Sequence, residues 1–209
     1  MAKKNHQGSK KKAQLVSINP DNPQQRLIKI VTEVLKRGGL ISYPTDTFYG
    51  IGCDLYNKKA IQLIYRLKER PLKKPFSFIC DGLKEISQYA RVSNYAYKTM
   101  KRLLPGPYTF ILEGTRLVPK IMLTKRKTVG IRVPDNNICL RIVQTFGQPV
   151  ISTSAGYDDP QLIFEAYEQF LDIVIDGGPM VQSPSSVISL IDDTPEIIRE
   201  GKGDISSFT

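Results

Sequence analysis

The order of helix-like and strand-like segments constrains this chain more than any other feature. Beyond residue 12, segments with apolar residues every three or four positions alternate with short apolar runs, and no repeat or long linker interrupts them. Glycine and proline, as at Gly38-Gly39 and Pro44, separate the segments. We expect strands at 40–43, 76–80, 108–112, 128–133, 149–153, 173–175, 186–191 and 196–199. We expect helices between Pro23 and Gly38, after Asn57, and over 82–90, 94–104, 137–146 and about 160–170.

This alternation predicts one α/β domain over residues 13–209, in which helices flank a twisted, open sheet of mixed strand direction. Residues 1–12 are rich in lysine and poor in apolar side chains, so we expect a disordered basic tail there.

The composition excludes several classes of protein. No apolar run approaches the ~20 residues that span a bilayer, and no apolar signal-peptide stretch follows the basic N-terminus, so we expect a cytoplasmic protein without a membrane partner. Cys53, Cys80 and Cys139 form no Cys-x-x-Cys pair and lie in apolar surroundings, which indicates buried thiols. The only histidine is His6, in the tail, so a Ser-His-Asp triad or a histidine-based zinc site in the domain is excluded, and we expect no protein-held metal.

The net charge of +10 is unevenly distributed along the sequence. Residues 1–12 carry +5, residues 13–156 carry 23 Lys+Arg and 9 Asp+Glu for a net +14, and residues 157–209 carry −9. This asymmetry indicates an anionic partner for the basic part, the alternative being a charged surface that only aids solubility.

Two segments stand out for their chemistry. The segment 44–52 follows an expected strand and combines hydroxyl side chains, two glycines and Asp46, which suits either a polar ligand or, more simply, a tight turn between strands. The segment 58–74 places seven cations within seventeen positions, with Glu69 as the only acid. Arginine and lysine are the usual phosphate ligands, so this cluster predicts phosphate binding, although cations at a helix C-terminus are also favoured by the helix dipole.

Four further segments are weak individually. Thr109 follows a rigid Pro-Gly-Pro turn, and Ser154 lies at a strand end, a frequent ligand position in α/β sheets. Arg132 lies inside an otherwise apolar strand and needs a partner, either a protein carboxylate or a ligand. Ser185 and Arg199 lie in polar segments near the C-terminus.

Taken together and in this order, these segments resemble the YrdC-like family, which includes the threonylcarbamoyl-AMP synthases of tRNA modification; the resemblance runs from about residue 25 to residue 203. It implies an open α/β fold with a large, basic, concave cavity, and a reaction of ATP, as its Mg²⁺ complex, with L-threonine or another small amino acid and bicarbonate, without a tightly bound cofactor. It also implies residue roles: Lys68 and Arg70 would be catalytic and bind the ATP phosphates, together with Thr109, Ser154 and Arg199 at the nucleotide, while Thr45, Arg132 and Ser185 would bind the amino acid.

The chain departs from the synthase pattern at identifiable positions. Gly156 stands where the synthases carry asparagine after Ser-Ala, and 75–79 lacks the histidine that the synthases commonly carry nearby. Pro-Phe-Ser-Phe and Pro-Gly-Pro-Tyr-Thr-Phe resemble the YciO branch of the family more closely, and we expect no counterpart of the extra C-terminal domain of longer synthases.

An alternative interpretation is a non-catalytic module that binds double-stranded RNA or tRNA through phosphate contacts. The candidate RNA-binding residues are Lys58, Lys59, Arg66, Lys73, Lys74, Lys125, Arg126 and Lys127. A third interpretation is a fold that has lost its chemistry and serves as a protein partner.

Overall fold

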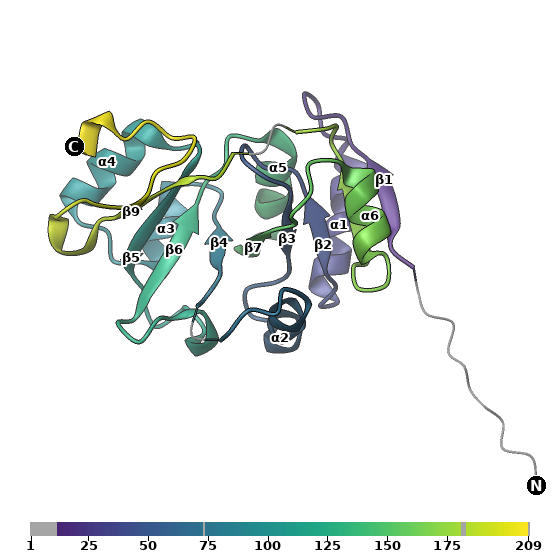
Figure 1. The fold of residues 1–209 in the computed structure, drawn as a ribbon, viewed down its shortest axis with the longest axis horizontal. Coiled ribbons are helices and arrows are strands. Elements are labelled where there is room, and N and C mark those ends of the chain that lie inside the picture. Colours follow the sequence, from purple (N-terminus) through teal and green to yellow (C-terminus); the bar gives the residue numbers. More distant parts are fainter. Residues whose placement is uncertain (1–11, 73, 181–182, 209) are drawn as a thin grey trace, which may run out of the picture.

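One open sheet of ten strands organises the computed structural model, which describes residues 12–72, 74–180 and 183–208 (Figure 1). The strand order is β1-β8-β2-β3-β7-β4-β6-β5-β9-β10. The strands are β1 (Gln14–Ser17), β2 (Ile41–Tyr43), β3 (Gly50–Gly52), β4 (Ser77–Ile79), β5 (Tyr108–Glu113), β6 (Thr128–Arg132), β7 (Val150–Ser154), β8 (Ile173–Asp176), β9 (Ser186–Ser189) and β10 (Glu196–Arg199). The α-helices are α1 (Gln25–Lys36), α2 (Lys58–Leu67), α3 (Leu83–Tyr89), α4 (Asn94–Leu103), α5 (Asn137–Phe146) and α6 (Pro160–Tyr167). Three short 3₁₀ turns, η1 (Lys120–Met122), η2 (Ile191–Asp193) and η3 (Ser206–Phe208), complete the described elements.

The sheet is mixed, which confirms the expected fold class. β1, β8 and β2 pair in parallel, β3 and β7 each run antiparallel to their neighbours, β4 and β6 are parallel, and β5 joins β6 antiparallel. Two strands, β1 and β3, were not predicted from the sequence. Most of the four residues of β1 are exposed, and β3 has only the three residues Gly-Ile-Gly within the segment 44–52. The tail expected at 1–12 lies outside the described residues, apart from Lys12.

Helices cover the two halves of the sheet differently. α1 and α5 pack against β2 and β8 through Ile28, Ile142 and their neighbours, and α6 packs on β8 from the opposite side through Ile163. In the other half, α3 and α4 lie behind β4, β5 and β6 (Figure 1). Tyr89 of α3, for example, meets Phe78 of β4 edge to face, with ring centroids 5.8 Å apart.

Side chains alternate between the two faces of a strand, so burying one face against helices leaves the other face free for a site. Phe78, Phe110 and Ile131 belong to the core on the side of α3 and α4. Ser77, Thr109 and Arg132 are their neighbours in sequence, and their side chains therefore point to the opposite face of the same three strands.

Candidate functional site

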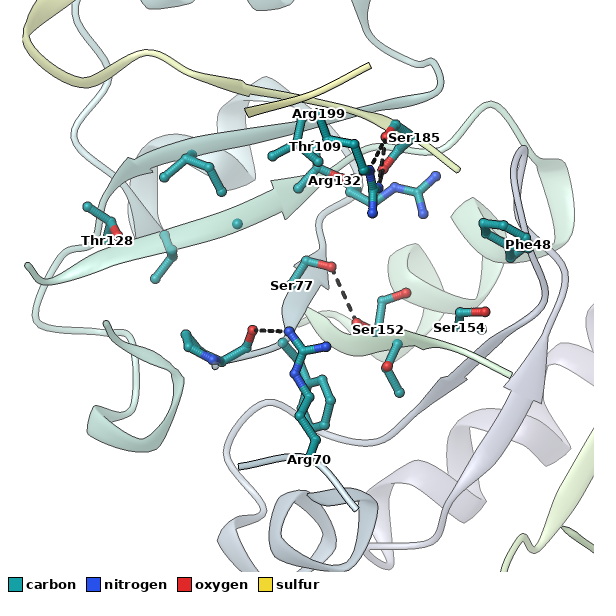
Figure 2. A pocket seen from close by; sticks show the side chains of 18 of the residues that line it. Phe48, Arg70, Ser77, Thr109, Thr128, Arg132, Ser152, Ser154, Ser185 and Arg199 are labelled. Atoms are coloured by element: carbon teal, nitrogen blue, oxygen red, sulfur yellow. Dashed lines mark hydrogen bonds between the residues drawn. The ribbon is translucent and has the colours of Figure 1, made fainter. Parts of the chain in front are cut away.

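A cavity of about 420 Å³ lies on this open face of β4, β5 and β6 (Figure 2). Its remaining lining comes from the segment after β2, the loop after α2, β7, and the segments around Ser185 and Arg199. Gly130 lies on its floor between Thr109 and Ser77, since a Cβ atom there would stand 3.3–3.4 Å from those side chains. The absence of a side chain at Gly130 therefore leaves space at the centre of the cavity.

The lining combines hydroxyl groups with three arginines. The hydroxyl residues are Ser77, Thr109, Thr124, Thr128, Ser152, Thr153, Ser154 and Ser185, together with Tyr49. The arginines are Arg70, Arg132 and Arg199, and no carboxylate is present among the described lining residues. In Figure 2, Arg70 lies on one side of the cavity and Arg132 and Arg199 on the other, with Ser77 and Ser152 between them. Such a lining favours an anionic ligand that also carries hydrogen-bonding groups.

Arg132 forms a buried ion pair beneath the cavity wall. One of its terminal nitrogens donates to Asp46 Oδ1 over 2.6 Å and to Thr47 Oγ1 over 2.9 Å, and the two charged side chains are only 9% and 7% exposed. The backbone N–H of Asp135 donates to the other carboxylate oxygen of Asp46. The Nε atom of Arg132 is buried and has no hydrogen-bond partner among the described residues. The sequence left open whether this arginine meets a protein carboxylate or a ligand, and the structure gives it the carboxylate.

Arg199 is positioned by the segment that leads into β9. Its guanidinium donates to the carbonyl and the hydroxyl oxygen of Ser185 over 2.8–3.1 Å, and the Ser185 hydroxyl is 2.8 Å from Thr109 Oγ1. Partial burial, followed by the positive charge of Arg132, lowers the pKa of Arg199. The two guanidinium groups therefore repel each other, and an anion between them would relieve that repulsion.

Arg70 is oriented by the turn that carries it. Its Nε donates to the carbonyl of Lys74 over 2.7 Å, a terminal nitrogen donates to the carbonyl of Pro75, and its guanidinium carbon stands 5.1 Å from the centre of the Phe76 ring. The side chain remains exposed. These contacts fix the orientation of the Arg70 guanidinium at the cavity, although the side chain is exposed.

Of the eight residues expected at the nucleotide or the amino acid, Thr45 and Lys68 do not line the cavity. The hydroxyl of buried Thr45 donates to the carbonyl of Phe48 over 2.6 Å and accepts from the N–H groups of Thr47 and Phe48, so it stabilises the turn between the antiparallel strands β2 and β3. This arrangement is the tight turn that the sequence favoured. Lys68 caps the end of α2, and its Nζ lies 3.5 Å from the carbonyl of Ala155 and 3.4 Å from the hydroxyl of Tyr167. Burial lowers its pKa.

The structure brings six of the expected residues to one cavity: Arg70, Thr109, Arg132, Ser154, Ser185 and Arg199. Their individual roles at a nucleotide or an amino acid stay predictions. Sequence analysis gave no individual role to Phe48, Ser77, Thr124, Thr128 or Ser152, which also line the cavity. The signal for Thr128 was the alternation in the strand expected at 128–133, where Thr128, Gly130 and Arg132 occupy every second position opposite the core. The strand expected at 76–80 gave no such signal for Ser77, because Ile79 two positions on is apolar.

The described residues also bear on metal and membrane chemistry. They contain no group of three His, Cys, Asp or Glu side chains able to hold a metal ion. Among the same residues, no helix combines the length and apolar character needed to cross a membrane. The three cysteines are free and buried, as expected, and burial raises the pKa of each thiol.

Comparison with known proteins identifies the family. A family model described as telomere recombination, which covers the Sua5, YciO and YrdC domains, matches residues 33–201. This chain belongs to the Sua5/YciO/YrdC family. Uncharacterized protein YciO of Escherichia coli is 43% identical over 204 residues, which are 94% of this chain and 99% of that protein. A protein of Methanocaldococcus jannaschii named putative threonylcarbamoyl-AMP synthase is 36% identical, over 91% of this chain and 94% of its own length.

Solved structures of the family agree with the fold. The crystal structure of Escherichia coli YciO superposes with a TM-score of 0.89, covering 94% of this chain and all of that one. Sua5 of Pyrococcus abyssi, solved in complex with L-threonine, superposes with a TM-score of 0.84 at 25% identity. The match covers 90% of this chain but only 58% of that Sua5 chain.

Proposed function

We propose that the cavity binds ATP with Mg²⁺ and a small amino acid, and that the protein transfers an adenylyl group in the manner of the threonylcarbamoyl-AMP synthases. One observation carries the proposal: three arginines from separate segments converge on a hydroxyl-rich cavity whose described lining contains no carboxylate. Arginine gives planar, bidentate contacts to phosphate oxygens, and serine and threonine hydroxyls suit ribose and amino-acid groups.

The chemistry asks for positioning and charge stabilisation instead of a protein base. A carbamate formed from the amino acid and bicarbonate would attack the α-phosphorus of ATP, forming an oxygen–phosphorus bond while the bond to the β-phosphate bridging oxygen breaks. Pyrophosphate leaves with the electron pair. Arg70 and Arg199 would neutralise the developing negative charge, and Mg²⁺ would enter as part of the nucleotide complex. Asp46 is unsuited to act as a free base, because Arg132 and the Asp135 N–H already engage both of its carboxylate oxygens.

Related proteins support the same reaction class. The protein of Methanocaldococcus jannaschii, which is of similar length, is named a putative threonylcarbamoyl-AMP synthase. A mouse protein that is 31% identical over 80% of this chain is named a threonylcarbamoyl-AMP synthase. The Sua5 protein of Pyrococcus abyssi, which shares the fold, was crystallised in complex with L-threonine. These relatives favour a small amino acid as the second ligand of the cavity.

Gly156 is the local feature that most sets this chain apart from the synthase pattern. It adopts φ +91°, and among the described residues, apart from its two chain neighbours, only Lys68 comes within 4 Å of a Cβ placed there, with Nζ at 4.0 Å. Space for a side chain therefore exists beside Lys68 and next to cavity-lining Ser154. Asparagine adopts positive φ more readily than most residues with a side chain, so among such residues it is the one best suited to this position, at the cost of backbone strain because φ +91° lies beyond the usual left-handed region.

Calorimetric titration of the protein with ATP and Mg²⁺ tests this assignment. Arg70→Ala removes a charged hydrogen-bonding group worth roughly 1.5–3 kcal/mol, which corresponds to about 10- to 150-fold weaker binding. Arg66→Ala is the matched control, since Arg66 is exposed on α2 and does not line the cavity. Equal ATP affinity in Arg70→Ala and Arg66→Ala would contradict the assignment.

RNA binding is the second candidate function, and one observation favours it. Seven of the cations expected to bind RNA are described, all are exposed, and none forms an ion pair with another described residue: Lys58, Lys59, Arg66, Lys74, Lys125, Arg126 and Lys127. Lys73 lies outside the described residues. α2 and the turn before β6, which carry six of the seven, lie along the same lower edge in Figure 1.

Filter binding to a double-stranded RNA at several salt concentrations tests this candidate. Phosphate-driven binding weakens steeply with salt, with a log–log slope that grows with the number of phosphate contacts. Replacing Lys125, Arg126 and Lys127 by glutamate removes about three phosphate contacts, so the log–log slope should become less steep by roughly that number. A slope that the triple variant leaves unchanged would remove this turn from the RNA-binding surface.

A further inference from the structure

A second groove, of about 410 Å³, lies outside the site described above. Its walls are the start of α2, Leu72 in the loop after that helix, and the segment around η1. The lining residues are Tyr56, Lys58, Ile61, Gln62, Leu72, Pro119, Lys120 and Ile121. None of them lines the arginine-containing cavity, so the groove is a separate feature.

The groove combines an apolar interior with a cationic rim. Tyr56 and Leu72 are 46% and 59% exposed, so apolar surface that a ligand would cover faces solvent. Lys58 and Lys120 are exposed, neither forms an ion pair with another described residue, and none of the described lining residues is acidic. Lys58 is also the first residue of the ten-residue helix α2, whose first turn carries no acidic side chain. The helix dipole therefore adds to the positive potential at this end of the groove.

We infer that this groove binds a small amphiphilic carboxylate, with an apolar chain or ring against Tyr56, Leu72 and Ile121 and its carboxylate between Lys58 and Lys120. The volume falls within the range of small-molecule pockets. Charge complementarity selects the anionic head group, because a cationic one would meet two lysines and the positive end of a helix.

The groove and the arginine-containing cavity share one segment of chain. Leu72 lines the groove, whereas Arg70 and Pro75 line the cavity. The backbone N–H of Lys74 donates to the carbonyl of Pro71, and the carbonyls of Lys74 and Pro75 in turn hold the Arg70 guanidinium. A ligand packed on Leu72 therefore restrains the turn that orients Arg70. The consequence for ATP, a change of at least about twofold in ATP affinity, rests on the proposed function.

Calorimetric titration of the full chain with decanoate, below its micelle concentration and without ATP, tests the groove. We expect saturable one-to-one binding, and weak or no binding of decyltrimethylammonium, which has the same chain and a cationic head. Lys120→Glu and Leu72→Ser should each weaken decanoate binding by about tenfold. Their matched controls are Lys125→Glu, a nearby exposed lysine, and Leu63→Ser, a partly exposed leucine on α2 outside the groove, which should change it less than about twofold.

Three outcomes would overturn parts of this inference. Absence of decanoate binding, or equal weakening by the groove variants and their controls, would overturn the groove as a ligand site. Equal binding of the cationic amphiphile would overturn the assignment of an anionic head group. Decanoate binding that leaves a measured ATP affinity unchanged would overturn only the link to Arg70. Because decanoate is titrated without ATP, failure of the proposed function leaves the result on the groove intact. Urea denaturation of each variant verifies that the substitution has not unfolded the protein.

Discussion

Replacing Asp46 by alanine leaves the Arg132 guanidinium buried, with the Thr47 hydroxyl as its one remaining hydrogen-bond partner among the described residues. The native pair joins nitrogen and oxygen over 2.6 Å with both side chains less than a tenth exposed, so solvent is a poor substitute for the lost carboxylate. Breaking a buried ion pair by removing one partner costs about 3–5 kcal/mol. We therefore expect Asp46→Ala to lower the free energy of unfolding by that amount.

Urea denaturation followed by circular dichroism measures this loss. With a slope of about 2 kcal/mol per molar urea, the midpoint should fall by roughly 1.5–2.5 M without a change of slope. Glu33→Ala is the control, because the Glu33–Lys36 pair has a similar distance of 2.8 Å but side chains that are 59% and 53% exposed. Its midpoint should not move measurably, since exposed pairs contribute little.

A double variant separates the ion pair from a general effect of substitution. Asp46→Leu combined with Arg132→Met removes both charges and keeps apolar volume, so this protein should be more stable than Asp46→Ala alone. A midpoint for Asp46→Ala close to that of the wild type, or a double variant no more stable than Asp46→Ala, would refute the reasoning that the pair is buried and coupled.

Two further predictions concern titrating groups. Burial lowers the pKa of Lys68, so the side chain binds its proton less readily in the folded protein than in the unfolded chain. The charged side chain therefore lowers the free energy of unfolding at every pH below the lowered pKa, and this loss disappears as the pH rises toward 10.5. Lys68→Met should therefore have a higher urea midpoint than the wild type at pH 7, and this difference should narrow toward pH 10.5. A difference that does not change with pH would contradict the prediction. The buried thiols titrate in both proteins and do not affect the difference. Burial raises the pKa of Glu85 from 4.5 to about 7, so its contribution to stability is present below pH 4.5 and is lost as the pH rises through 7. Glu85→Gln should flatten the pH dependence of the urea midpoint across this window, and an unchanged dependence would show that other groups cause it.

Local patterns predicted the elements well because their signals are local. Asn57 and Ser93 each cap the helix that follows by accepting an N–H three residues on, and Gly147 ends α5 in the left-handed conformation. The strand β1 escaped prediction since its place depends on pairing with β8, more than 150 residues away. No local pattern contains that information.

In the site, too, features with local sequence signals were predicted and contacts between distant segments were not. Six expected residues line one cavity, which the ordered motifs and the family resemblance anticipated. The partner of Arg132 lies 86 residues away, so sequence spacing alone could not choose between a protein carboxylate and a ligand. Lys68 and Arg70 are two residues apart and were expected to act together, but Lys68 terminates α2 while Arg70 belongs to the following turn. Their side chains consequently point to different surroundings.

Pyrophosphate release from ATP, at saturating Mg²⁺ and with or without L-threonine and bicarbonate, tests the central claim most directly. The proposed function predicts release that requires all three substrates, falls by about tenfold or more in Arg70→Ala, and is unaffected by Arg66→Ala. Gly156→Asn, which restores the synthase residue in open space, should raise the rate. The account would be contradicted if the wild-type protein binds ATP but releases no pyrophosphate in the presence of threonine and bicarbonate, and if Gly156→Asn also releases none.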